Sequence, residues 1–275
     1  MANFQTSDGV TIFYTDEGTE EVPVLCLSGL TRNSSDFSYI DGHLPGARLI
    51  KMDYRGRGKS DWVEDFTTYS VLREAQDAIE LMDHLGLERF AILGTSRGGL
   101  IAMTLGAMCM DRLIGVAMND IGPELDTAGL SAIMGYLGRP PVWKTYAEAA
   151  AVRSSVMAGF ANVPDSRWRE EVEKQHHQTP NDLINTYDPK LRDAVEAASL
   201  QAVPDLWPFF TAFAHLPVAL IRGANSDLLS ATAFERMQKE LPDALAVTVA
   251  DRGHIPFLDE PEALDTLRVW IARLT

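Results

Sequence analysis

A serine between glycines is the residue in this sequence that most suggests covalent chemistry. Residues 94–98 read Gly-Thr-Ser-Arg-Gly and match the pattern G-x-S-x-G. In that pattern the serine lies on a sharp turn from a strand into a helix, and the glycines lack the Cβ atoms that would clash across the bend. The N-terminus of the following helix favours negative charge that develops beside the hydroxyl. Ser96 is therefore the candidate nucleophile.

A serine hydroxyl is a weak nucleophile, so a base must remove its proton and a third group must orient that base. Of the six histidines, His254 directly follows Gly253, in the loop after an apolar run at 244–251. This places it at the carboxyl end of a predicted strand, the same edge as Ser96. His176 and His177 fall in a charged stretch and are expected on the solvated face of a helix. His254 is the expected base.

Two aspartates compete for the orienting role. Asp227 follows the strand predicted at 217–223, and Asp120 ends the strand predicted at 113–120. Both lie on the carboxyl edge of the predicted sheet, where ligand sites of open α/β sheets occur. We favour Asp227, because its strand should neighbour the one that leads to His254. Asp120 stays open as the alternative.

An acyl-transfer site also needs two donors for the oxyanion. One is the backbone N–H of the residue after the nucleophile, Arg97. The other should come from a loop after an early strand, where Gly29 permits close approach and Leu30 offers its N–H. The candidate pocket walls are aromatic residues of the region after residue 123, namely Tyr136, Trp143, Trp168, Trp207, Phe209 and Phe210.

Apolar runs typical of strands alternate with helical patterns along most of the chain. This alternation predicts βαβ units and an α/β fold with a doubly wound, mostly parallel sheet. From 123 to 213 the pattern is helical without an obvious strand, which is too long for a loop. We therefore expect a core of residues 1–122 and 214–275, with residues 123–213 as a helical cap over the carboxyl edge of the strands.

Composition limits the partners. The formal net charge is −15, which disfavours nucleic acid and acidic membrane surfaces as partners. Two cysteines in apolar runs, no signal-peptide pattern and no apolar stretch of membrane-spanning length indicate a cytoplasmic protein. No metal-ligand spacing, P-loop or dinucleotide fingerprint is present, so we expect no cofactor and no metal, only a small-molecule substrate. The oligomeric state is left open.

Six short segments in this order resemble the α/β-hydrolase superfamily, over essentially the whole chain. They are DGVTIFY, LSGL, DYRGRGKSD from Asp53 to Asp61, GTSRGG, the Ser-Asp pair after the strand at 217–223, and RGHIPFLDEP. The resemblance implies an eight-stranded, mostly parallel sheet with a helical cap. It also implies a triad of Ser96, Asp227 and His254, and a structural role for Arg55 and Gly56.

Two positions depart from the usual pattern of that superfamily. Ser28 stands where many members have histidine. Arg97 stands where methionine or glutamine is frequent, and its cation could pair with Glu124 or Asp120, or favour anionic substrates.

The resemblance implies hydrolysis through a covalent acyl-enzyme. The leading interpretation is a serine hydrolase that cleaves a small, fairly apolar carboxylic ester or lactone. Three alternatives remain: carbon–carbon bond hydrolysis of a dienoate with a carboxylate contact from Arg97 or Arg139, cofactor-free haloperoxidase-like perhydrolysis, and slow-turnover ligand sensing with a protein partner. The fold alone does not choose among them.

Overall fold

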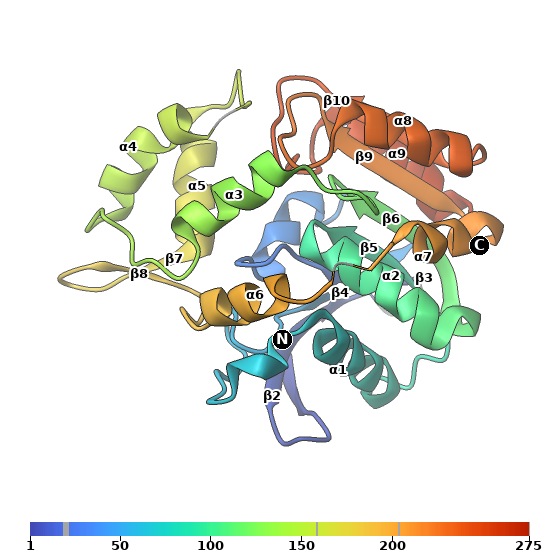
Figure 1. Ribbon diagram of the computed structural model, residues 1–275, viewed down its shortest axis with the longest axis horizontal. Coiled ribbons are helices and arrows are strands. Elements are labelled where there is room, and N and C mark those ends of the chain that lie inside the picture. The colour runs from blue at the N-terminus through green and yellow to red at the C-terminus, as the bar shows by residue number, and fades with distance from the viewer. Residues whose placement is uncertain (19–21, 158, 203, 275) are drawn as a thin grey trace.

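The computed structural model describes residues 1–18, 22–157, 159–202 and 204–274. An eight-stranded sheet runs through the molecule (Figure 1) and confirms the doubly wound, mostly parallel arrangement. All its neighbouring pairs from β4 to β10 are parallel, while β1 and β2 extend it antiparallel at one edge. In spatial order the strands are β1 (Ala2–Gln5), β2 (Thr11–Glu17), β4 (Ala47–Met52), β3 (Val22–Leu27), β5 (Phe90–Thr95), β6 (Leu113–Asn119), β9 (Val218–Gly223) and β10 (Leu245–Val249).

Helices cover both faces of this sheet, which explains why its central strands are apolar without alternation. Phe90 and Ile92 of β5 face a core shared with α1, α2, α7 and α8, whereas Ala91 and Leu93 face a core shared with η1 and α9. The helices concerned are η1 (Ser34–Ile40), α1 (Val71–His84), α2 (Arg97–Cys109), α7 (Trp207–Thr211), α8 (Ala231–Glu240) and α9 (Pro261–Ala272). Short 3₁₀ turns η2 (Phe66–Thr68), η3 (Met110–Arg112) and η4 (Ala212–His215) connect them.

The region after β6 forms a layer of its own, drawn in green to orange at the left of Figure 1. Its elements are α3 (Thr127–Tyr136), α4 (Tyr146–Val156), α5 (Asp165–Gln175), β7 (His176–Gln178), β8 (Leu183–Asn185) and α6 (Leu191–Ser199). The expected cap segment also includes α7, which packs against α2 of the core instead. The proposed boundaries at 123 and 213 stay a prediction.

The placement of His176 and His177 in a charged helix is wrong. Helix α5 ends at Gln175, and both histidines form β7, which pairs antiparallel with β8. The reason is the turn between the two strands, where Thr179 N donates to Asp182 O at 2.8 Å. Strand β1 was not predicted either, because it is short and polar and pairs through its backbone at the sheet edge. Within the described residues no helix has the length and apolar character needed to cross a membrane.

Candidate active site

Ser96 lies on the turn between β5 and α2, as the glycine pattern predicts. Its φ of 50° is in the left-handed region, which a side-chain-bearing residue adopts only under local strain. The flanking glycines are required by close packing. A Cβ on Gly94 would lie 2.6 Å from Gly98 O, and a Cβ on Gly98 would lie 2.0 Å from Leu27 O. The local fold therefore holds the Ser96 hydroxyl at the carboxyl edge of the sheet.

His254 reaches this hydroxyl from the loop after β10. Its Nε2 is 2.9 Å from Ser96 Oγ, which is hydrogen-bonding distance for proton transfer. The loop is tied to β6, because Asn119 Nδ2 donates to Pro256 O at 3.1 Å. The His254 side chain is 16% exposed, so the pair is shielded from bulk water yet open on one side.

Asp120 completes the chain of hydrogen bonds. Its Oδ2 lies 2.7 Å from His254 Nδ1, and its side chain is fully buried. Two further donors hold the carboxylate: Gly223 N donates to Oδ1 at 2.8 Å, and Ser226 Oγ donates to Oδ2 at 2.6 Å. A carboxylate fixed in this way can orient the imidazole and stabilise the imidazolium form.

The expectation that Asp227 orients His254 is therefore corrected to Asp120. Asp227 does follow β9, but the course of the loop after this strand places Asp120, not Asp227, beside His254. Asp227 is exposed, and its carbonyl accepts a hydrogen bond from Gly129 N of α3 at 3.1 Å, which turns this part of the loop toward the cap. Asp120 follows β6 without an intervening loop. Its signal in the sequence was the pair Asn119-Asp120 at the end of a strand.

A cavity of about 610 Å³ opens over these side chains, within the range of small-molecule sites. Ser96 and His254 form its floor together with Gly29 and Leu30 of the loop after β3. The region from α3 to β8 supplies most of the other lining residues. Its apolar members include Ala132, Ile133, Val142, Trp143, Val156 and Met157, and its polar members include Tyr136, Arg139, Arg153, Gln175, His176 and Asn185.

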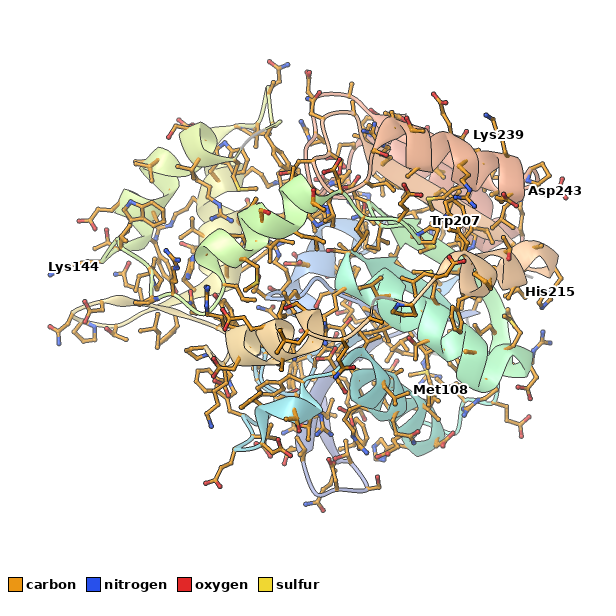
Figure 2. The ribbon with its side chains drawn as sticks, in the orientation of Figure 1. Met108, Lys144, Trp207, His215, Lys239 and Asp243 are labelled. Atoms are coloured by element: carbon orange, nitrogen blue, oxygen red, sulfur yellow. The ribbon has the colours of Figure 1, made fainter. Side chains whose placement is uncertain are left out.

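Of the predicted wall residues, Tyr136 and Trp143 line this cavity. The other predictions are wrong. Trp168 is buried in an aromatic cluster with Phe160 and Phe257. Trp207 and Phe210 belong to the core beside the sheet, and Phe209, on the same helix α7, is exposed and does not line the cavity. Figure 2 shows Trp207 near α7, far from Lys144 at the tip of the cap.

Arg97 does not contact either acid proposed for it. Its Nε pairs with Glu74 Oε2 at 2.6 Å, and its Nη2 donates to Tyr69 O at 3.1 Å. Glu74 is fully buried and also pairs with Arg57 Nη1 at 2.7 Å. The Arg97 side chain thus belongs to a buried ion-pair network behind the turn, and does not line the cavity.

The loop after β3 presents Leu30 to the cavity. A Cβ on Gly29 would lie 3.8 Å from Ser96 Cβ, so the backbone passes close to the nucleophile. Ser28, the departure noted in this loop, is buried; its carbonyl accepts from Tyr54 Oη at 3.1 Å, and its hydroxyl has no hydrogen-bond partner among the described residues. Among those residues, no cluster of three His, Cys, Asp or Glu side chains could hold a metal ion.

Comparison with known proteins gives consistent results. The pattern of the family described as "Alpha/beta hydrolase family" matches residues 24–266. A 3-hydroxybutyrate-oligomer hydrolase of Cupriavidus necator is 32% identical, over 86% of this chain and 84% of the relative. A 2-(acetamidomethylene)succinate hydrolase of Mesorhizobium japonicum is 26% identical, over 84% of this chain and 81% of the relative. The crystal structure of an alpha/beta hydrolase from Novosphingobium aromaticivorans superposes with a TM-score of 0.91 at 33% identity, covering 99% of this chain and 97% of that one.

Proposed function

The chain belongs to the alpha/beta hydrolase family, and from that premise we propose that it is a serine hydrolase of small carboxylic esters or lactones. One observation carries the proposal. Ser96 Oγ, His254 and Asp120 form a continuous chain of hydrogen bonds of 2.9 and 2.7 Å that opens on the cavity of about 610 Å³. The relative named for oligomers of 3-hydroxybutyrate supports an ester substrate, since an ester is the bond by which one hydroxy acid joins the next.

The first half-reaction would form an acyl-enzyme. Ser96 Oγ attacks the carbonyl carbon while His254 Nε2 takes its proton, and Asp120 stabilises the resulting imidazolium. The tetrahedral oxyanion accepts hydrogen bonds from the backbone N–H groups of Leu30 and Arg97. His254 then gives its proton to the leaving alkoxide, and the alcohol departs.

The second half-reaction would release the acid. Water attacks the acyl carbon as His254 removes one of its protons, and the same proton returns to Ser96 Oγ when the ester to the enzyme breaks. The products are one alcohol and one carboxylic acid for each water consumed. In a lactone both groups stay on one molecule.

Serine dependence can be tested with a fluorophosphonate probe and p-nitrophenyl acetate. The wild-type protein should be labelled by the probe at Ser96 and should hydrolyse the ester. Ser96→Ala should lose labelling, and its kcat should fall by about 10⁴-fold or more. Ser155→Ala, at an exposed serine of α4, is the matched control and should keep both. Full turnover by Ser96→Ala would contradict the proposal.

A further inference from the structure

Arg153 is a cation without a counter-ion on the wall of the active-site cavity. It lies on α4 of the cap, and its Nη2 donates to Gln175 Oε1 at 2.8 Å. Its Nε is buried and has no hydrogen-bond partner among the described residues, none of which forms an ion pair with it. The guanidinium therefore keeps free donors beside the cavity that also contains Ser96.

The nearby carboxylates are engaged elsewhere. Glu171 Oε2 accepts from Arg32 Nη2 at 2.6 Å and from Gln175 Nε2 at 3.3 Å, and its Oε1 accepts from Tyr39 Oη at 3.1 Å. Gln175 thus joins the two systems: its amide N–H is held by Glu171, and its carbonyl holds Arg153. This arrangement orients the Arg153 guanidinium without neutralising it. The acid on the cavity wall, Asp227, is exposed and forms no ion pair within the described chain.

Such an arrangement is unfavourable for the empty protein. Burial lowers the pKa of Arg153 below its usual range and the neighbouring Arg32 cation lowers it further, while Glu171 and Tyr136 offset only part of this shift. Arg153 is partly buried and its Nε is fully buried, and a desolvated charge without a partner destabilises the fold unless another interaction compensates. Arginine is also the side chain best suited to hold a carboxylate by two parallel hydrogen bonds. The missing partner is therefore expected to be an anion that enters the cavity.

Two neutral polar side chains of the cap line the same cavity as Arg153. His176 and Asn185 line the same part of the cap, and His176 Nδ1 is buried without a hydrogen-bond partner in the described structure. Burial and the Arg153 cation lower the pKa of His176 to about 4, so its imidazole is neutral at pH 7. The protein as a whole carries a formal charge of −15, which repels anions at long range. Binding an anion in the cavity thus depends on a local cation.

We propose that Arg153 binds a carboxylate of the substrate, so that the preferred substrates are esters whose acyl or alcohol part carries a free carboxylate. This inference rests on the proposed ester hydrolysis at Ser96 and adds the substrate class. Ser96, on the turn after β5, and Arg153, on α4, both line one cavity. The ester would lie at Ser96, the apolar linker along the cap side chains, and the carboxylate at Arg153.

Binding can be separated from turnover by working in the Ser96→Ala protein. Isothermal titration with monomethyl glutarate and with dimethyl glutarate compares a carboxylate with a neutral ester of similar shape. The monoester should bind about 10–100-fold more tightly, as expected for charge-assisted hydrogen bonds. Adding Arg153→Gln should abolish this preference. Adding Arg169→Gln, which removes the same charge from an exposed position on α5 paired with Glu173, should preserve it.

Either of two binding results would overturn the proposal: no preference for the monoester in the Ser96→Ala protein, or an unchanged preference after Arg153→Gln. Turnover then distinguishes the two proposals. In the protein with an intact Ser96, the ratio of kcat/KM for mono-4-nitrophenyl glutarate to that for 4-nitrophenyl butyrate should fall about 10–100-fold with Arg153→Gln. Monoester binding at Arg153 without any Ser96-dependent turnover would contradict the proposed function and leave the carboxylate site standing.

Stability gives an independent readout if Arg153→Gln folds poorly. Arg153→Met removes the unpaired cation and keeps the apolar stem, so Tm without ligand should rise or stay the same, as at many functional sites. Arg153→Lys keeps the charge and should retain part of the preference for the monoester. A large fall in Tm for Arg153→Met, together with an undiminished preference for the monoester in that variant, would assign Arg153 a structural role and overturn the proposal.

Discussion

Asp120 Oδ2 lies 2.7 Å from His254 Nδ1, and it is the loop containing Asp227 that holds Asp120 there. The Asp120 carboxylate accepts hydrogen bonds from Gly223 N, at the end of β9, and from Ser226 Oγ, in the loop that follows. The acid thus comes from β6, the neighbour of the strand that carries Ser96, while the next strand provides its donors. The loop after β9 has a positioning role instead of supplying the acid itself.

This relationship predicts different effects of two asparagine substitutions. Asp120→Asn should lower kcat for p-nitrophenyl acetate by about 10³–10⁴-fold, because an amide cannot stabilise the imidazolium or hold the required tautomer. Asp227→Asn should change kcat by less than about tenfold, because Asp227 does not contact His254. Both variants should be checked for folding by near-UV circular dichroism. Loss of activity in Asp227→Asn with an active Asp120→Asn would reverse the assignment.

The ion pairs behind the nucleophile predict a separation of stability from activity. Glu74→Gln leaves the buried Arg57 and the partly buried Arg97 without their shared carboxylate, so the free energy of unfolding should fall by about 3–5 kcal/mol. Arg97→Met keeps the backbone N–H proposed for the oxyanion and leaves Glu74 paired with Arg57. It should therefore destabilise less and retain hydrolysis. Urea unfolding and p-nitrophenyl acetate turnover measure the two effects; greater loss of stability in Arg97→Met would contradict this account.

Two glycines should respond in opposite ways to alanine. A Cβ on Gly98 would lie 2.0 Å from the Leu27 carbonyl oxygen, so Gly98→Ala must displace backbone and should cost about 4 kcal/mol or more. Gly135 of α3 has open space around it, and Gly135→Ala should stabilise by up to about 1 kcal/mol through helix propensity. Thermal unfolding of both variants compares them directly. Equal Tm values would show that the turn at Ser96 tolerates a displaced backbone.

The sequence predicts those features that depend on local pattern. The alternation of apolar runs and helical stretches is enough for the doubly wound sheet, and helix α1 begins after Ser70 and ends before Gly86 with a φ of 68°. The turn at Ser96 and the loop of His254 are also predicted, because each directly follows an apolar run that reads as a strand. All these features depend on residues close together in the sequence, and the spacing of apolar residues reflects such local relationships.

Pairings between distant residues are not encoded in such patterns. Asp120 and Asp227 both follow strands, and hydrogen bonds to the start of α3, from Gly129 N to Asp227 O and from Asp126 N to Leu228 O, turn the second loop toward the cap. Arg153 gave no signal, because its significance lies in the counter-ion that its surroundings lack. Trp168 and Phe210 could not be separated from Tyr136 and Trp143 by residue type, since buried packing and cavity walls both use aromatic side chains.

His176 predicts a measurable dependence of stability on pH. Its pKa is about 4 in the folded protein, mainly because burial disfavours the charged imidazole, and near the usual 6.5 when the chain is unfolded. Between these values the unfolded chain binds more protons, so this group's contribution to stability is complete above about pH 6.5 and is lost as the pH falls toward 4. The loss amounts to about 3 kcal/mol at most, from 1.36 kcal/mol for each pKa unit.

The test compares the pH dependence of stability between variants, because buried carboxyls with raised pKa, such as Asp36, act in the opposite direction. The fall in unfolding free energy from pH 7 to pH 4.5 should be smaller in His176→Gln than in wild type. His177→Gln, at the exposed neighbour on β7, should match wild type, and equal pH dependence in all three proteins would show that His176 is not desolvated in solution.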